Sequence, residues 1–182
     1  MILAMPDQAD VRTTHRGRLL TVDVLSWTDA DGRAVEREVV HHPGAVLVVP
    51  RLDDERLVLV RNERVAVQCH LLEFPAGKLE PGEAPPDAAG RELEEETGYR
   101  PGRVRALGEF YTSPGFCDEL LRVFVADELE PVGQKLEPGE NLEVEVITRT
   151  EVMAMIGDGR IRDGKTIAAL FMWILEPRVA RP

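Results

Sequence analysis

Residues 77–99 read GKLEPGEAPPDAAGRELEEETGY, and the rest of the chain is arranged around this stretch. Its middle predicts a short helix that begins near Pro86 or Asp87, because proline suits the first helical turn. The helix is expected to end at Gly98, because glycine suits the left-handed conformation that stops a helix. The stretch therefore predicts a loop, a helix and a sharp stop.

Three glutamates share one face of this predicted helix. At about 100° per residue, Glu92, Glu95 and Glu96 fall within one sector, whereas Glu94 points away. Like charges one turn apart repel by several tenths of a kcal/mol, and a divalent cation would relieve that repulsion. Carboxylates without His or Cys favour Mg²⁺ or Mn²⁺ over Zn²⁺, and Arg91 can brace Glu95 from one turn away. The alternative for the EEE run alone is a solvated face.

The complete pattern matches a known motif. The matching positions are Gly77, Glu83, Arg91, Glu92, Glu95, Glu96 and Gly98. They resemble the Nudix box, a match that chance gives on the order of once in 10⁸ start positions. Two positions depart from the pattern: Tyr99 stands where an aliphatic residue is usual, and Gly90 lies inside the helix at a cost of about 1 kcal/mol. Neither is a ligand.

The resemblance implies a Nudix hydrolase, which cleaves a nucleoside diphosphate linked to another group. We expect Glu92 and Glu96 to be the first metal ligands and Glu95 the next, and the resemblance adds the carbonyl of Ala76. Mg²⁺ is the expected cofactor, with Mn²⁺ able to substitute. Glu83 is expected to orient the loop or to bind an outer water of the metal.

Composition limits the class of protein. The 182 residues predict a single domain over 1–182, and a hydrophobic content of 43% allows a real core. A net charge of −11 argues against non-specific binding to nucleic acid or to an anionic membrane, so the expected partner is a small molecule. Two cysteines, no secretion signal and no long apolar run favour a cytoplasmic location.

The order of elements predicts an α/β fold. Residues 17–27 and 35–42 are expected to form a β-hairpin ahead of the main domain, after a loose start over 1–10. Further strands are predicted at 45–50, 57–61, 104–112, 120–126 and 142–147, and helices at 151–156 and 165–175. Mixed strands with helices on both sides indicate an α/β/α sandwich with a mixed sheet. The Nudix resemblance implies the same fold. The tail, 178–182, is uninformative.

Outside the box, the chain is similar to the ADP-ribose pyrophosphatase group over most of residues 17–175. The matching segments are 37–40, 73–77, 113–115 with Glu119, and 164–170, and Pro114 lies fifteen residues past Tyr99. This resemblance implies hydrolysis of ADP-ribose to AMP and ribose 5-phosphate. It also implies a homodimer in which the strands at 17–42 are exchanged and form both active sites.

The same resemblance assigns substrate contacts. Arg37 would contact the adenine end, Arg64 the phosphates from the partner subunit, and Glu119 the terminal ribose. Glu73, Pro114 and Gly115 complete the predicted substrate-binding set. Each has a plainer interpretation, as an exposed strand charge or as part of an ordinary turn.

The general base is expected in the loop at 137–143. Glu140 best matches the catalytic glutamate of the group, ahead of Glu143, and Glu95 or Glu96 is the alternative within the box. A base there would take the proton of an attacking water. Glu137 and Glu145 also compete for the role. Trp27 is expected in a dimer interface or stacked on a base.

Other substrates and classes stay open at this stage. GDP-mannose, ADP-glucose or FAD would undergo the same chemistry, and loop shapes decide among them. A hydrolase that removes oxidised nucleoside triphosphates from the nucleotide pool is a further enzyme alternative. A non-enzymatic sensor of nucleotide sugars is the alternative from another class, although sensors can lose the metal glutamates that this chain keeps.

Overall fold

The computed structural model describes residues 9–176, so most of the predicted loose start and the whole tail at 178–182 lie outside the described residues. The chain forms two compact units, one containing the chain up to Gly44 with Phe110–Leu120, the other containing Ala45–Glu109 and the chain from Leu121 onward. The first boundary falls directly after the N-terminal strands. The prediction of a single domain with an N-terminal element stays a prediction.

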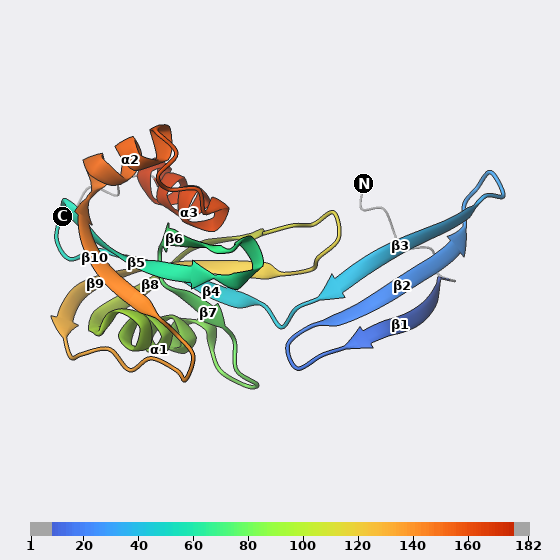
Figure 1. Ribbon diagram of the computed structural model, residues 1–182, viewed down its shortest axis with the longest axis horizontal. Helices are drawn as coiled ribbons and strands as arrows, with labels where there is room; N and C mark the ends of the chain where they lie inside the picture. Colours follow the sequence, from blue (N-terminus) through green and yellow to red (C-terminus); the bar gives the residue numbers. More distant parts are fainter. Residues whose placement is uncertain (1–8, 177–182) are drawn as a thin grey trace. The chain divides into compact units, whose positions relative to one another are not determined.

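The N-terminal unit holds an antiparallel sheet in the order β1-β2-β3 (Figure 1). Its strands are β1 (Asp10–Arg16), β2 (Thr21–Thr28) and β3 (Ala34–His41). The predicted hairpin is β2-β3, and its turn is fixed by Asp29, whose Oδ1 accepts the N–H groups of Asp31 and Arg33. Strand β1 was not predicted, because all seven of its side chains are exposed and show no apolar alternation.

The other unit contains the remaining elements, except for the last two residues of β8 and the first residue of β9, which belong to the N-terminal unit. They are β4 (Ala45–Pro50), β5 (Arg56–Arg64), a 3₁₀ turn at Val65–Val67, β6 (Cys69–Glu73), β7 (Ala76–Lys78), α1 (Pro85–Thr97), β8 (Tyr99–Tyr111), β9 (Leu120–Pro131), β10 (Leu142–Thr148), α2 (Arg149–Gly157) and α3 (Gly164–Leu175). One sheet has the order β10-β5-β6 and another β7-β4-β9-β8. Strand β4 is parallel to β9 and antiparallel to β7, so the sheet is mixed, as predicted.

The core lies on both faces of β4, whose six residues are all buried. On one face, Val46 and Val48 join Phe124 of β9 and the α1 residues Ala88, Ala89 and Leu93 in one apolar cluster. Figure 1 shows α1 on one side of the sheets and α2 and α3 on the other. This layering is the predicted α/β/α sandwich.

The helix ends follow the predicted signals within a residue or two. Helix α1 has proline at its first two positions and stops at Gly98, whose φ is 72°. Helix α2 begins with a capping box between Thr148 and Glu151, and the Asp163 side chain caps α3 by accepting the N–H of Thr166. Within residues 9–176, no helix is both long and apolar enough to cross a membrane.

Candidate active site

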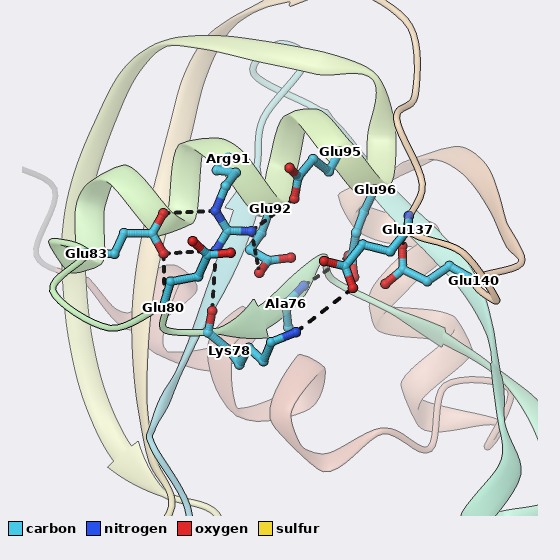
Figure 2. A network of polar contacts seen from close by, with 10 residues as sticks. All are labelled: Ala76, Lys78, Glu80, Glu83, Arg91, Glu92, Glu95, Glu96, Glu137 and Glu140. Carbon is cyan, nitrogen blue, oxygen red and sulfur yellow. Dashed lines mark hydrogen bonds and ion pairs between the residues drawn. The ribbon is translucent and has the colours of Figure 1, made fainter. Parts of the chain in front are cut away.

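The Glu92 side chain lies directly against the backbone of Gly77. A Cβ atom at position 77 would lie 1.9 Å from Cδ of Glu92, so the Glu92 carboxylate occupies the space that a side chain there would need. Figure 2 shows the segment from Ala76 to Lys78 running beneath the glutamates of α1. The motif therefore has glycine at this distance from Glu92 for a steric reason.

Glu96 is the most enclosed carboxylate of the predicted ligand set, with 6% of its surface exposed. Its Oε2 accepts a hydrogen bond of 3.1 Å from the backbone N–H of Ala76. Burial, reinforced by the nearby charges of Glu92 and Glu140, raises the pKa of Glu96 to about 8. Glu96 was predicted as a metal ligand and the resemblance added Ala76, and the structure brings these two residues together.

Arg91 braces the acidic face from within the helix (Figure 2). Its Nε and Nη2 donate to the two oxygens of Glu83 at 2.8 and 2.9 Å. Its Nη1 donates to Glu92 and Glu95, each at 2.9 Å. Glu83 also accepts the N–H of Glu80, and its two predicted roles stay predictions.

Glu94 faces away from the other three glutamates, as the helical period predicts. Its carboxylate accepts hydrogen bonds from Arg100 at 2.8 Å and from Lys135 at 2.7 Å. It is therefore tied to neighbouring elements and takes no part in the acidic face.

The acidic face suits a hard divalent cation by its chemistry. Burial raises the pKa of Glu92, with Arg91 opposing the shift, and it raises that of Glu96, so both carboxylates lack full compensation for their charge. Among residues 9–176, no three Asp, Glu, His or Cys side chains converge on one point as they stand. Arg91 draws Glu92 and Glu95 toward itself, while Glu96 bonds to Ala76. Rotation of these side chains would supply oxygen ligands alone, the set that Mg²⁺ prefers.

Glu140 lies in a loop close to this face. Its Oε2 accepts the N–H of Glu137 at 2.9 Å, and its own N–H donates to the carbonyl of Glu137 at 3.0 Å. Its charge acts on the Glu96 carboxyl, and Figure 2 shows both side chains. Among its predicted competitors, Glu145 forms an ion pair with Arg61 and Glu143 is exposed on β10.

Glu73 is buried, with 1% of its surface exposed, and both of its oxygens are bonded. It accepts Nε and Nη2 of Arg64 at 2.9 and 2.6 Å, and also Nζ of Lys165. The hydrogen bonds to Glu73 are the main cause of the raised pKa of Arg64. Glu73 thus holds two cations in place. Lys165 was missed, although it lies in the matched segment at 164–170.

The other predicted substrate residues belong to the N-terminal unit. The Arg37 guanidinium lies over the Trp27 ring, 5.9 Å from its centroid. Pro114 and Gly115 form the tip of a turn closed by the N–H groups of Phe116 and Cys117 on the carbonyl of Ser113. The Glu119 carboxylate accepts a hydrogen bond of 2.6 Å from Thr112. The substrate roles of these residues stay predictions.

Alanine at position 77 is expected to disturb metal binding and to spare the fold. The new Cβ would displace the flexible end of Glu92 and leave the backbone in place, so affinity for Mn²⁺ should fall about tenfold or more. Isothermal titration calorimetry measures this affinity. The matched control is Gly90→Ala, whose Cβ meets only Pro101 Cγ at 3.9 Å. It should raise Tm by about 2–4 °C, because alanine favours a helix interior by about 1 kcal/mol, with Mn²⁺ affinity unchanged.

His41 is expected to titrate above pH 6.5. Its Nδ1 lies 2.6 Å from Oδ2 of Asp118 and its Nε2 lies 3.2 Å from Oδ2 of Asp23, and the hydrogen bond to Asp118 is the main cause of the raised pKa. Because the folded pKa exceeds the unfolded value, the stabilisation is complete below about pH 6.5 and is lost as pH rises through the folded pKa. An NMR titration measures this pKa. Asp118→Asn should lower it, and an unchanged value would contradict the assignment.

Known proteins resemble this chain over most of its length. The NUDIX domain family matches residues 41–170. ADP-ribose pyrophosphatase of Bacillus subtilis (strain 168) is 42% identical over 156 residues, which cover 85% of this chain and 84% of that protein. Methanol dehydrogenase activator of Bacillus methanolicus is 38% identical with the same coverage.

A solved structure confirms the predicted fold. The crystal structure of an ADP compounds hydrolase aligns with a TM-score of 0.81 at 26% identity, covering 92% of this chain and 91% of the other. Together with the pyrophosphatase relative, it confirms the resemblance to the ADP-ribose pyrophosphatase group. Enzymes of the matched family generally use divalent metal ions. The chain therefore belongs to the Nudix family and is a Nudix hydrolase.

Proposed function

We propose that this enzyme hydrolyses the pyrophosphate bond of ADP-ribose to give AMP and ribose 5-phosphate, with Mg²⁺ as the cofactor and Mn²⁺ able to replace it. The observation that carries the proposal is the acidic face of α1, where Glu92, Glu95 and Glu96 stand over the segment that begins at Ala76. The pyrophosphatase relative supports ADP-ribose over GDP-mannose, ADP-glucose or FAD as the substrate.

The three glutamates and the Ala76 carbonyl would hold the metal. When bound, the metal supplies positive charge for the non-bridging oxygens of the diphosphate and for the charge that develops during substitution at phosphorus. Arg91 would keep its two bonds to Glu83 if Glu92 and Glu95 turned toward a cation, so it would remain as a brace. The chain thus provides ligands and fixes the helix face that carries them.

Glu140 is the proposed general base. Its carboxylate would accept the proton of the attacking water, and the N–H of Glu137 holds one of its oxygens. Arg64 is proposed to contact a phosphate oxygen. Its Nε and Nη2 are fixed by Glu73, and Nη1 makes no hydrogen bond to another residue of the described chain. As the resemblance implies, Arg64 would make this contact from the partner subunit.

The N-terminal unit completes the proposal. Arg37 would contact the adenine, Glu119 the terminal ribose, and the turn with Pro114 and Gly115 the substrate between them. The enzyme would act as a cytoplasmic homodimer in which the strands at 17–42 contribute to both active sites. It would bind a nucleotide sugar, and it would bind neither nucleic acid nor a membrane.

Initial rates against a substrate panel test this proposal. The panel holds ADP-ribose, ADP-glucose, GDP-mannose, FAD and the nucleoside triphosphates, each with Mg²⁺ and then Mn²⁺, and chromatography resolves the products. The expected result is a kcat/KM for ADP-ribose at least about tenfold above the others, which corresponds to about 1.4 kcal/mol of discrimination. EDTA should abolish the rate.

Two outcomes would overturn the proposed substrate. Comparable rates on several nucleotide sugars would make this a broad nucleotide-sugar hydrolase. No turnover of any compound would favour a nucleotide-sugar sensor that regulates a partner protein, a role to which the name of the Bacillus methanolicus relative lends support.

A further inference from the structure

The segment from Val132 to Lys135 lies against the C-terminal end of α1. The N–H groups of Val132 and Gly133 donate to the carbonyl of Gly98 at 2.7 and 3.1 Å, and the N–H of Lys135 donates to the carbonyl of Glu95 at 3.0 Å. The last carbonyls of a helix have no partner within the helix. This segment supplies that partner and fixes the start of the loop that carries Glu140.

The Gln134 side chain joins both ends of this loop to α1. Its Nε2 donates to the carbonyl of Glu96 at 2.7 Å and to the carbonyl of Leu142 at 3.3 Å. Glu96 carries a carboxylate of the acidic face, and Leu142 is the first residue of β10, where the loop ends. A single amide group thus connects the helix face and the far end of the loop.

Gly98 makes this close approach possible. A Cβ atom at position 98 would lie 2.6 Å from the backbone N of Gln134 and 2.7 Å from the carbonyl carbon of Gly133. Both neighbours are backbone atoms, so the loop would have to move away from the helix. The motif glycine at 98 therefore stops the helix and also leaves room for the loop.

Within the loop, Glu140 is held by local bonds. Its backbone and carboxylate each bond to Glu137, and Gly139 between them has a φ of 95°. The tip of the loop is thus fixed by local bonds, and its two ends are tied to α1 by Gln134. A change at these ends would move the tip, with Glu140, relative to Glu96.

We propose that Gln134 is a positioning residue that sets the place of Glu140 relative to the acidic face of α1. This inference rests on the proposed function, since it takes Glu140 as the general base. Gln134 is exposed at the surface. Its replacement would break the link and leave the apolar core untouched.

A double-mutant cycle tests this role. The variants are Gln134→Met, which keeps the length and loses the donor, Gln134→Glu, which puts an acceptor before two carbonyls, Glu140→Gln, and the two double variants. We expect Gln134→Met to lower kcat about tenfold and Gln134→Glu to lower it further. KM and the half-saturating Mg²⁺ concentration should stay within about twofold of wild type, because neither depends on the base.

The decisive comparison is made in the Glu140→Gln background. There, Gln134→Met should cause no further loss, because its effect acts through Glu140. The control is Lys135→Met, which removes only the contact with Glu94, and its kcat should match wild type. An equal loss in both backgrounds would mean a general structural role and would overturn the inference, as would an unchanged kcat or a loss confined to KM.

The cycle is run with whichever panel compound is turned over fastest. A failure of ADP-ribose as substrate is therefore seen in the panel, and a failure of the inference is seen in the cycle. Wild-type turnover by Glu140→Gln would overturn the base and the positioning role together.

Discussion

Glu96→Gln should lower kcat by about 100-fold or more while leaving the fold intact. Loss of a neighbour that merely orients a metal ligand typically costs 10- to 100-fold, so loss of a ligand should cost at least as much. Glutamine has the same length, and its Oε1 can still accept the N–H of Ala76, the one hydrogen bond of this carboxylate within residues 9–176. The change therefore removes the ability of this side chain to ionise and bind a metal as a carboxylate, and little else.

The metal-free stability of this variant should depend on pH in a way that differs from wild type. Because the folded pKa of Glu96 is raised from 4.5 to about 8, the folded wild type retains a proton that the unfolded chain releases between these values. Its contribution to stability is therefore complete below about pH 4.5 and falls as pH rises toward 8. Glutamine does not titrate and loses no stability over this pH range, so the variant should match or exceed the Tm of wild type at pH 8 in EDTA.

Steady-state kinetics over a Mg²⁺ series and thermal melting in EDTA check both expectations. The matched control is Glu94→Gln, the same substitution on the opposite face of α1, where the carboxylate bonds, among the described residues, only to Arg100 and Lys135. Its kcat should equal that of wild type. Near-normal turnover by Glu96→Gln at saturating Mg²⁺ would remove Glu96 from the ligand set.

Glu140→Gln should slow turnover by about 10²- to 10⁴-fold, the usual contribution of a general base. The amide retains the shape of the side chain and can still accept the N–H of Glu137, but it cannot take up a proton. The Mg²⁺ requirement should not change, because Glu140 bonds to its own loop and not to the helix that carries the ligands.

Glu143→Gln is the control for this base, since Glu143 is exposed on β10 and was the second candidate from sequence. Its kcat should stay within about twofold of wild type. A slow Glu143→Gln with a normal Glu140→Gln would move the base to β10. A raised Mg²⁺ requirement in Glu140→Gln at constant kcat would make Glu140 a metal ligand.

The helix with its acidic face was predictable because its signals are local. Proline at its start, Gly98 at its end and the helical period are all contained in the stretch itself, and they placed Glu94 apart from Glu95 and Glu96 correctly. Strand β1 was not predictable in this way. Its side chains are all exposed, and its pairing with β2 alone defines it as a strand.

The contacts that hold the site were less accessible to sequence. Lys165 reaches Glu73 across 92 residues of chain, and Gln134 reaches the Glu96 carbonyl across 38. No periodicity records such pairs, and a lone glutamine in a polar loop carries no pattern at all. Gly77 was placed by its motif, yet the reason for the glycine is the Glu92 carboxylate that fills its side-chain space.

The capping of α1 by the segment at 132–135 has a consequence for local unfolding. Release of this segment would leave the carbonyls of Glu95 and Gly98 without their backbone donors, so the end of the helix would fray as the loop opened. The amides of Val132, Gly133 and Lys135 should then exchange with deuterium at the same rate as those in the last turn of α1. The carboxylate helix and the Glu140 loop would form one cooperative unit, which is lost and recovered as a whole.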